Sequence, residues 1–160
     1  MAVIVRPALA AEVQVLAAVH ALCFADADVA GPPWSAEAIS SLLTLPGVAA
    51  LIAQEDDQPL GMALIRTVVD EAEILTVGVT LVARGRGVGG ALVSACAQAA
   101  AAAGAAALYL EVAETNTAAR CLYAATGFEP IGRRANYYHL AGQAVAAMLL
   151  RRTLDATPAV

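Results

Sequence analysis

A glutamate within an apolar stretch is the first feature of the sequence that points to chemistry. Glu111 stands in ALYLEV (107–112), where strand alternation places it on the opposite face from the leucines. Burial of a carboxylate is unfavourable unless the group is paired or used. Burial also moves such a group towards the working range of a general base. Glu111 is therefore a candidate base, and the alternative is a structural glutamate with a partner in the sheet.

An asparagine and a tyrosine follow this strand at a spacing that suggests a shared site. Asn116 and Tyr123 are seven residues apart, which is two helical turns, so both face the same way. A helix that begins near Asn116 can direct both side chains at one cleft, although a tyrosine at such a position can also be core. Cys121 has no histidine or other base beside it in the sequence, which argues against a cysteine nucleophile.

The glycine-rich segment RGRGVGG (84–90) admits two interpretations. Residues 85–90 contain G-x-G-x-x-G, and Glu111 lies downstream, as in a dinucleotide-binding fingerprint. Three observations argue against that interpretation. Residues 80–84 separate the first glycine from its strand, Glu111 lies inside a strand rather than beyond its end, and only one β-α-β unit is predicted.

The same segment also fits R-x-x-G-x-G, with Arg84, Gly87 and Gly89 at the fixed positions. It predicts a helix N-terminus whose backbone N–H groups are unobstructed by side chains, and such a terminus binds phosphate. Arg86 adds a positive charge. The alternative is a tight helix-packing turn, but so many glycines lose backbone entropy on folding and need a reason.

The elements that must position these residues can be predicted from periodicity and turn signals. Strands at 48–54, 60–69 and 74–79, joined by polar turns, form an antiparallel meander. A helix at 88–103 between strands 74–79 and 107–112 makes those two strands parallel. The remaining predicted elements are a strand at 3–6, a helix at 9–22, a loop at 25–34, a helix capped by Ser35, a helix at 117–126 ended by Gly127, and strands at 128–134 and 145–152. The predicted fold class is α+β, layered α/β/α, around a mixed sheet.

Length and composition limit the class of protein. The chain has 160 residues, which fits one domain at 1–152 followed by a frayed tail at 153–160. Its net charge of −5 argues against nucleic acid as a partner. Three unpatterned cysteines and two distant histidines indicate no disulfide framework and no metal site, and favour a reducing, cytoplasmic compartment. Residues 87–110 carry no charge but contain polar interruptions, so we expect a buried helix and strand rather than a membrane span.

From Glu71 to Tyr138 the chain resembles the GNAT acetyltransferases. The matching stretches are DEAEILTVGV, RGRGVGGALV, LYLEVAETNTAARCLYAATGF and GRRANYY, preceded by CF and PWS. Within the family it looks most like the RimI group, which acetylates the N-terminal alanine of a small-subunit ribosomal protein. The resemblance covers most of the chain and implies acetyl-CoA as the cofactor.

The resemblance implies a role for each part of the site. The backbone of Val77, Gly78 and Val79 would pair with the pantetheine arm like an added strand, because strands 74–79 and 107–112 splay apart in this fold. Glu111 would be the general base and Tyr123 the general acid in a direct transfer. The other cofactor residues would be Arg84, Gly85, Arg86, Gly87, Val88, Gly89 and Gly90 at the pyrophosphate, with Asn116, and the substrate residues Trp34, Tyr137 and Tyr138.

Several departures leave the acceptor open. The stretch between Phe24 and Trp34 is longer than usual, residues 139–150 lack an acidic residue before the last strand, and Glu73 is a rival base. At pH 7 about a tenth of an α-amine is neutral, against well under a thousandth of a lysine amine, so one carboxylate base suits an N-terminus better. We therefore expect a protein N-terminal acetyltransferase. A GNAT acting on lysine or a small amine, or a non-catalytic acyl-CoA binder, remains the alternative.

Overall fold

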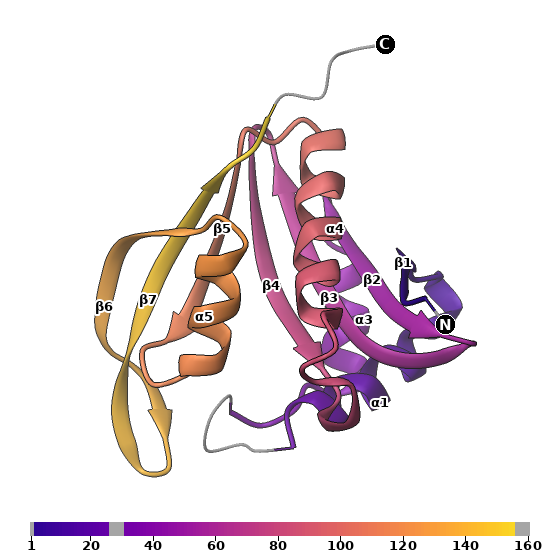
Figure 1. Cartoon of the computed structure of the whole chain (residues 1–160), viewed down its shortest axis with the longest axis horizontal. Coiled ribbons are helices and arrows are strands. Elements are labelled where there is room, and N and C mark those ends of the chain that lie inside the picture. Colours follow the sequence, from indigo (N-terminus) through magenta and orange to yellow (C-terminus); the bar gives the residue numbers. More distant parts are fainter. Residues whose placement is uncertain (1, 26–30, 156–160) are drawn as a thin grey trace.

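A seven-stranded sheet with helices on both faces makes up the fold (Figure 1). The computed structural model describes residues 2–25 and 31–155. The strands are β1 (Ile4–Pro7), β2 (Val48–Glu55), β3 (Gln58–Val68), β4 (Glu71–Val79), β5 (Ala107–Ala113), β6 (Glu129–Leu140) and β7 (Gln143–Thr153). The helices are α1 (Val13–Cys23), α3 (Ala36–Leu43), α4 (Val88–Ala102) and α5 (Thr117–Ala125), with short 3-10 turns η1 (Ala10–Glu12) and η2 (Leu81–Ala83).

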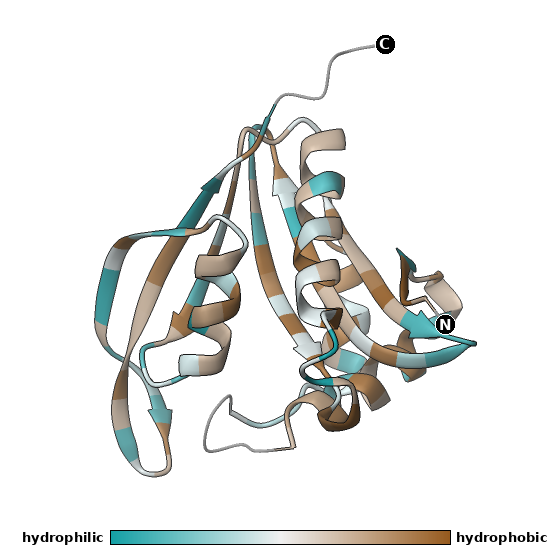
Figure 2. Cartoon of the chain, in the orientation of Figure 1, coloured by the Kyte–Doolittle hydropathy of each residue, from teal (hydrophilic) through white to brown (hydrophobic). Residues whose placement is uncertain are grey.

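Alternation along β3 shows how the layers form. Met62 and Leu64 pack in a core with α1 and α3, whereas Ala63 and Ile65 pack in a second core with α4 and α5. Successive strand residues point to opposite faces, so the two pairs of helices cover opposite sides of the sheet. The predicted α/β/α layering is thus confirmed. Figure 2 shows the apolar residues concentrated along the central strands and the hydrophilic ones on β6 and at the β2–β3 turn.

Helix α4 is built from small and apolar residues with a clear buried side. Val88, Leu92, Cys96 and Ala100 repeat every fourth residue and are all buried against the sheet. The helix ends at Ala102, one residue before the predicted end, and Gly104 follows with a φ of 96°. Among the described residues, no helix is long and apolar enough to cross a membrane.

The sheet contains one parallel pair, and that pair is short. The strand order is β1-β2-β3-β4-β5-β7-β6, and every neighbouring pair except β4–β5 is antiparallel. Strands β4 and β5 pair only at Glu71↔Ala107, Ala72↔Leu108 and Glu73↔Tyr109. Beyond these residues the two strands diverge, as predicted, and leave a gap in the sheet through the rest of β4 (Figure 1).

The last two strands differ from the prediction. β6 extends through the tyrosine pair to Leu140, and β7 begins at Gln143, whereas 128–134 and 145–152 were expected. The physical reason is an interruption inside β6: Asn136 has a φ of 55°, and pairing with β7 stops at Arg134 and resumes at Tyr138. A polar residue in the left-handed conformation is typical of turns, yet β6 continues beyond Asn136.

The C-terminal end of the fold lies beyond residue 152. Thr153 belongs to β7, and Leu154 is buried with its N–H donating to the Ala106 carbonyl. Residues 156–160, the rest of the expected tail, lie outside the described residues, as do residues 26–30 of the expected loop.

Ser35 caps α3 as predicted, because its hydroxyl accepts a hydrogen bond from the Ala38 N–H at 3.1 Å.

Candidate active site

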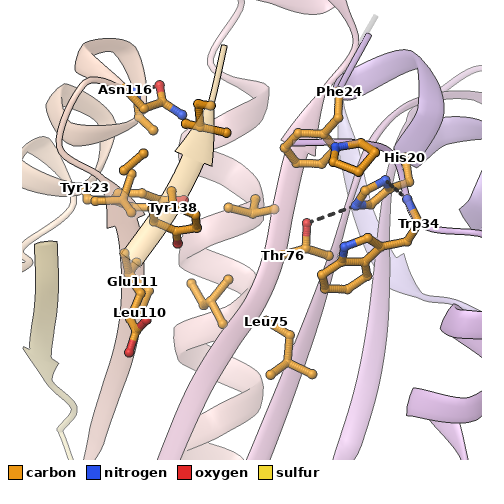
Figure 3. Close-up of a pocket in the computed structure, with 17 residues that line it drawn as sticks. His20, Phe24, Trp34, Leu75, Thr76, Leu110, Glu111, Asn116, Tyr123 and Tyr138 are labelled. Atoms are coloured by element: carbon orange, nitrogen blue, oxygen red, sulfur yellow. Dashed lines mark hydrogen bonds between the residues drawn. The ribbon is translucent and has the colours of Figure 1, made fainter. Parts of the chain in front are cut away.

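Two adjoining cavities open at the point where β4 and β5 diverge. The first, of about 250 Å³, lies between β4 and β5 and is walled by residues of α1, α5 and β6 (Figure 3). The second, of about 470 Å³, follows β4 to the N-terminus of α4. We call the first the acceptor cavity and the second the cofactor groove. Both are lined by Phe24, Val77, Asn116, Ala119 and Tyr123, which therefore mark the junction.

Small residues and backbone form most of the cofactor groove. Gly87 is the N-cap of α4 with a φ of 82°, and no side chain among residues 2–25 and 31–155 caps the helix. A Cβ atom built on Gly90 would meet no atom of the described residues within 4 Å, so their packing does not require a glycine there. Uncapped N–H groups at the start of a long helix, next to open space, form a site suited to phosphate. Of the predicted cofactor residues, those that line this groove are Val77, Gly78, Val79, Arg84, Gly85, Gly87, Val88, Gly89, Gly90 and Asn116.

The two arginines of the loop have different positions. Arg84 lines the groove and donates hydrogen bonds to the carbonyls of Cys23 (3.1 Å) and Val79 (3.4 Å), which ties the loop to α1 and β4. Arg86 is not among the groove residues. It forms an ion pair with Glu55 at 2.7 Å, and this contact lowers the pKa of the Glu55 carboxyl. Its charge is therefore directed at β2.

The candidate base lies on β5 and faces the acceptor cavity. Glu111 alternates with the buried Leu110 and Val112, as the strand pattern predicts. Its side chain keeps 21% of its surface exposed, and a guanidinium nitrogen of Arg134 lies 3.4 Å from one carboxylate oxygen. The expectation of a buried carboxylate is thus corrected, because the gap between β4 and β5 admits solvent and β6 supplies a counter-charge.

The candidate acid lies at the junction of the two cavities. Tyr123 is 7% exposed, and its ring meets that of Phe128 edge-on at 5.6 Å. Burial raises the pKa of the Tyr123 hydroxyl, so this group keeps its proton at neutral pH. Tyr123 lines both cavities and can reach a group held in either.

Asn116 has a structural contact as well as a place at the junction. It is the N-cap of α5, and its side-chain oxygen accepts a hydrogen bond from the Ala119 N–H at 3.2 Å. Its amide nitrogen is then the end of the side chain available to a ligand. The two-turn spacing from Tyr123 brings both side chains to the same cavities.

Glu73 lies on β4 next to the candidate base but outside both cavities. Partial burial and the negative charge of Glu111 raise the pKa of the Glu73 carboxyl, although Arg134 and Arg66 oppose this effect. The two carboxylates thus repel each other. Because only Glu111 lines the acceptor cavity, the geometry favours it over Glu73 as the base.

The wall opposite Glu111 is aromatic and contains a residue that sequence reasoning missed. The ring of His20 lies 4.4 Å from that of Phe24 and is stacked 5.0 Å from that of Trp34 (Figure 3). His20 is 2% exposed, and burial lowers its pKa from 6.5 to about 4. Its position within an apolar helix gave no sign of this role, since its neighbours in space are far away in sequence.

The tyrosine pair on β6 divides between the cavity and the surface. Tyr138 lines the acceptor cavity, and its pKa is raised by burial and by the nearby charge of Glu111. Tyr137 is 47% exposed and lies outside the cavity, with the Arg134 guanidinium 5.5 Å from its ring centre. Trp34, the third predicted substrate residue, lines the cavity.

Metal-ligating and thiol groups form no second site in the part of the chain that the structure describes. Residues 2–25 and 31–155 contain no cluster of three or more His, Cys, Asp or Glu side chains that could hold a metal ion. The cysteines are free: Cys23 and Cys96 are buried, and Cys121 is exposed. Burial raises the pKa of both buried thiols to about 12, so they are protonated and unreactive at neutral pH.

Comparison with known families agrees with this geometry. The profile of the acetyltransferase (GNAT) family matches residues 17–128, which include β4, the glycine loop, β5 and α5. The chain therefore belongs to the GNAT acetyltransferase family, whose members take their acyl group from an acyl coenzyme A.

Two individual proteins are similar to about half of the chain. The chain is 34% identical over 84 residues to the ribosomal protein bS18-alanine N-acetyltransferase of Haemophilus ducreyi, a match covering 52% of this chain and 58% of that protein. It is 43% identical over 82 residues to an uncharacterised protein of Mycobacterium leprae, covering 51% of this chain and 21% of that one. The matched segment thus spans less than two thirds of either curated relative.

Solved structures share the fold over the full chain. The ribosomal-protein-S18-alanine N-acetyltransferase of Escherichia coli superposes with a TM-score of 0.85 at 21% identity, covering 99% of both chains. NAA60 of Arabidopsis thaliana, solved with a bisubstrate analogue, superposes with a TM-score of 0.77 at 18% identity, covering 98% of this chain and 100% of that one. Similarity at these identities establishes the GNAT fold.

Proposed function

We propose that this chain is an acetyl-CoA-dependent N-acetyltransferase that acetylates a protein N-terminal α-amine, with the N-terminal alanine of a ribosomal protein as the favoured target. The observation that carries the proposal is that Glu111 and Tyr123 line one cavity, while Tyr123 also lines the adjoining groove. A proton acceptor and a proton donor thus flank the point where an amine and a thioester would meet. The catalytic domain would extend past the expected end at residue 152 to include Leu154, and it would act in the cytoplasm where ribosomal proteins are made.

The groove suits coenzyme A by its shape and its hydrogen-bonding groups. The open N-terminus of α4 and the glycines 85, 87 and 90 would hold the pyrophosphate. In the described part of the chain, the edge of β4 has no strand partner on the β5 side beyond Glu73, so the backbone of residues 77–79 would be able to pair with the amides of the pantetheine arm. Acetyl-CoA, when bound, would supply the activated acetyl thioester.

The side chains at the junction then divide the work. Glu111, directly or through water, accepts a proton from the acceptor ammonium, and the free amine attacks the acetyl carbonyl carbon. As the carbon–sulfur bond breaks, the Tyr123 hydroxyl would donate its hydrogen to the departing sulfur, and the nitrogen would give up its second proton to the Tyr123 oxygen as the amide forms. The products are an amide and free coenzyme A. The N–H near Val79 is a suitable donor to the acetyl oxygen. No covalent enzyme intermediate is needed, which agrees with the two buried cysteines being protonated.

The names of two relatives support the acceptor class. The Haemophilus ducreyi relative and the Escherichia coli structural neighbour are both alanine N-acetyltransferases of a ribosomal protein.

The test is an acetylation assay on the full chain. Acetyl-CoA is combined with a peptide that begins with alanine, the same peptide with a blocked N-terminus and an internal lysine, and a polyamine, and free coenzyme A is measured. We expect release with the alanine peptide. Glu111→Gln should lower kcat by about a hundredfold or more while acetyl-CoA still binds. Glu73→Gln is the matched control and should retain most of the activity.

Three outcomes would contradict parts of the proposal. If acetyl-CoA binds but none of the amines causes release of coenzyme A, the protein is a non-catalytic acyl-CoA binder. A preference for the lysine peptide or the polyamine would refute the N-terminal assignment. A larger loss from Glu73→Gln than from Glu111→Gln would exchange the roles of the two carboxylates.

A further inference from the structure

A chain of hydrogen bonds runs from the aromatic wall of the acceptor cavity to a hydroxyl group on β4. The Trp34 backbone N–H donates to Nδ1 of His20 at 3.1 Å, and Nε2 of His20 lies 3.4 Å from Oγ1 of Thr76. Figure 3 shows these contacts as dashed lines, on the opposite side of the cavity from Glu111 and Tyr138. Three segments far apart in sequence are joined in this way.

The directions of these hydrogen bonds follow from the chemistry of the groups. A backbone N–H can only donate, so Nδ1 of His20 must be the unprotonated nitrogen. Burial keeps His20 neutral at pH 7, since its pKa is lowered to about 4, and its proton is therefore on Nε2. Nε2–H then donates to Oγ1 of Thr76.

This arrangement fixes the role that remains for the Thr76 hydroxyl. With a lone pair of Oγ1 occupied by His20, the hydroxyl hydrogen is left to be donated elsewhere. Within residues 2–25 and 31–155, no protein group accepts it, and Thr76 lines the acceptor cavity. The wall thus presents an oriented, neutral hydrogen-bond donor to whatever occupies the cavity.

We propose that Thr76, held by His20, donates a hydrogen bond to the carbonyl oxygen of the first residue of the acceptor and so selects amines that carry a neighbouring carbonyl. This role rests on the proposed acetyltransferase function. In an N-terminal residue the amine and the carbonyl are attached to the same carbon, so Glu111 on one wall and Thr76 on the other can hold one residue between them. A lysine side chain or a polyamine has no carbonyl beside its reacting amine.

A donor of this kind discriminates mainly by rejection. An acceptor without the carbonyl leaves the Thr76 hydrogen unpaired inside the cavity, which costs binding free energy. The aromatic rings of Phe24 and Trp34, stacked on His20, keep the imidazole in place. His20 is therefore a positioning residue, and Thr76 is the group that would touch the substrate.

The experiment compares two small acceptors that differ by the carbonyl. Alaninamide has it and isopropylamine does not, and each is measured as a competitive inhibitor against an alanine-terminated peptide, so that neither needs to be turned over. Thr76→Val removes the hydroxyl and keeps the shape, Thr76→Ser keeps the hydroxyl, and Thr67→Val is the matched control, since Thr67 lies on β3 outside both cavities.

We expect Thr76→Val to raise the inhibition constant of alaninamide and the KM of the peptide about tenfold, the usual worth of one hydrogen bond. The constants for isopropylamine and the KM for acetyl-CoA should not change. Thr76→Ser should restore most of the affinity. His20→Gln should reproduce part of the loss, because the glutamine amide can donate to Thr76 but lacks the ring that stacks between Phe24 and Trp34.

Two results would overturn the assignment. An equal loss for alaninamide and isopropylamine would show that the hydroxyl serves the fold or the acetyl group rather than the acceptor carbonyl. No loss for either would show that Thr76 touches neither. Failure of the proposed function itself would look different, because the unmodified protein would then release no coenzyme A with any peptide.

Discussion

The two halves of the site are built in contrasting ways. The cofactor groove is made largely of backbone and glycine from one stretch of chain, residues 77–90, and the acceptor cavity is made of side chains from positions between 20 and 140. The first needs only a strand edge, a turn and a helix N-terminus. The second depends on the register of β5 against β7 and on the interruption at Asn136 in β6.

This difference explains what a change in sequence can do to each half. Substitutions anywhere on α1, β4, β5 or β6 can reshape the acceptor cavity without touching the glycine loop. The GNAT fold can therefore keep one cofactor groove and serve many acceptors. The halves should be coupled through the five residues that line both cavities, which are Phe24, Val77, Asn116, Ala119 and Tyr123.

The largest effect is expected where the halves meet. Tyr123→Phe removes the hydroxyl and preserves the ring contact with Phe128. We expect kcat to fall about a hundredfold, because the departing sulfur loses its proton donor. The KM for acetyl-CoA and for the peptide should change little. Steady-state kinetics check this, and a large rise in either KM with kcat preserved would make Tyr123 a binding residue instead.

A fall in pH should destabilise the packing around the acceptor cavity, which His20 lines, before it affects the cofactor groove. His20 has a pKa of about 4 in the fold against 6.5 in an unfolded chain, so the unfolded state binds more protons between these values. The free energy of unfolding should therefore fall as the pH drops from 6.5 to 4, by up to roughly 3 kcal/mol at 1.36 kcal/mol per pKa unit.

Urea titrations at several pH values measure this loss, with His20→Gln as the comparison that lacks the titrating group. The acceptor KM should rise over the same range while acetyl-CoA binding persists. If the variant loses stability with acid as steeply as the parent protein, other groups are responsible and His20 is not the sensitive point.

A smaller effect would sharpen the comparison from the cofactor side. Gly90→Ala adds a methyl group to the first turn of α4, where no atom of residues 2–25 or 31–155 lies within 4 Å of it. We expect the fold to gain about 0.5–1 kcal/mol, since alanine favours the helix. The dissociation constant of acetyl-CoA should rise about tenfold, the loss of one charge-assisted hydrogen bond. Calorimetry measures both, and unchanged affinity would place the phosphates elsewhere.

The sequence predicted the fold well because its signals are local. The glycine loop before an apolar helix, the short turns of the meander and the Ser35 cap each act within a few residues, and all are present in the structure. The layering and the parallel pair followed from those elements. The strand predicted to end at Arg134 continues as β6 to Leu140, and its pairing with β7 is interrupted between Arg134 and Tyr138, around the left-handed Asn136.

The site was predictable only in part, for the same reason. Glu111 and Tyr123 could be found from alternation and helical spacing, which are also local. The partner of Glu111 on β6, the neutral state of His20 and its contact with Thr76 depend on pairs separated by 23 to 56 residues along the chain, which only the packed structure brings together. The charge of Arg86 was expected at the groove, but Glu55 holds it elsewhere.

The short β4–β5 pairing has a mechanical consequence. Strands β1–β4 form one arm of the sheet and β5, β7 and β6 form another, and backbone pairing joins the arms only at three residue pairs around Ala72 and Leu108. These three residue pairs are the point about which the two arms of the sheet could rotate relative to each other. A small rotation about them changes the width between the arms along the whole seam, while every hydrogen-bonded ladder within each arm stays intact. The gap between β4 and β5 could thus widen or narrow around a ligand while each strand keeps its hydrogen-bonded neighbours.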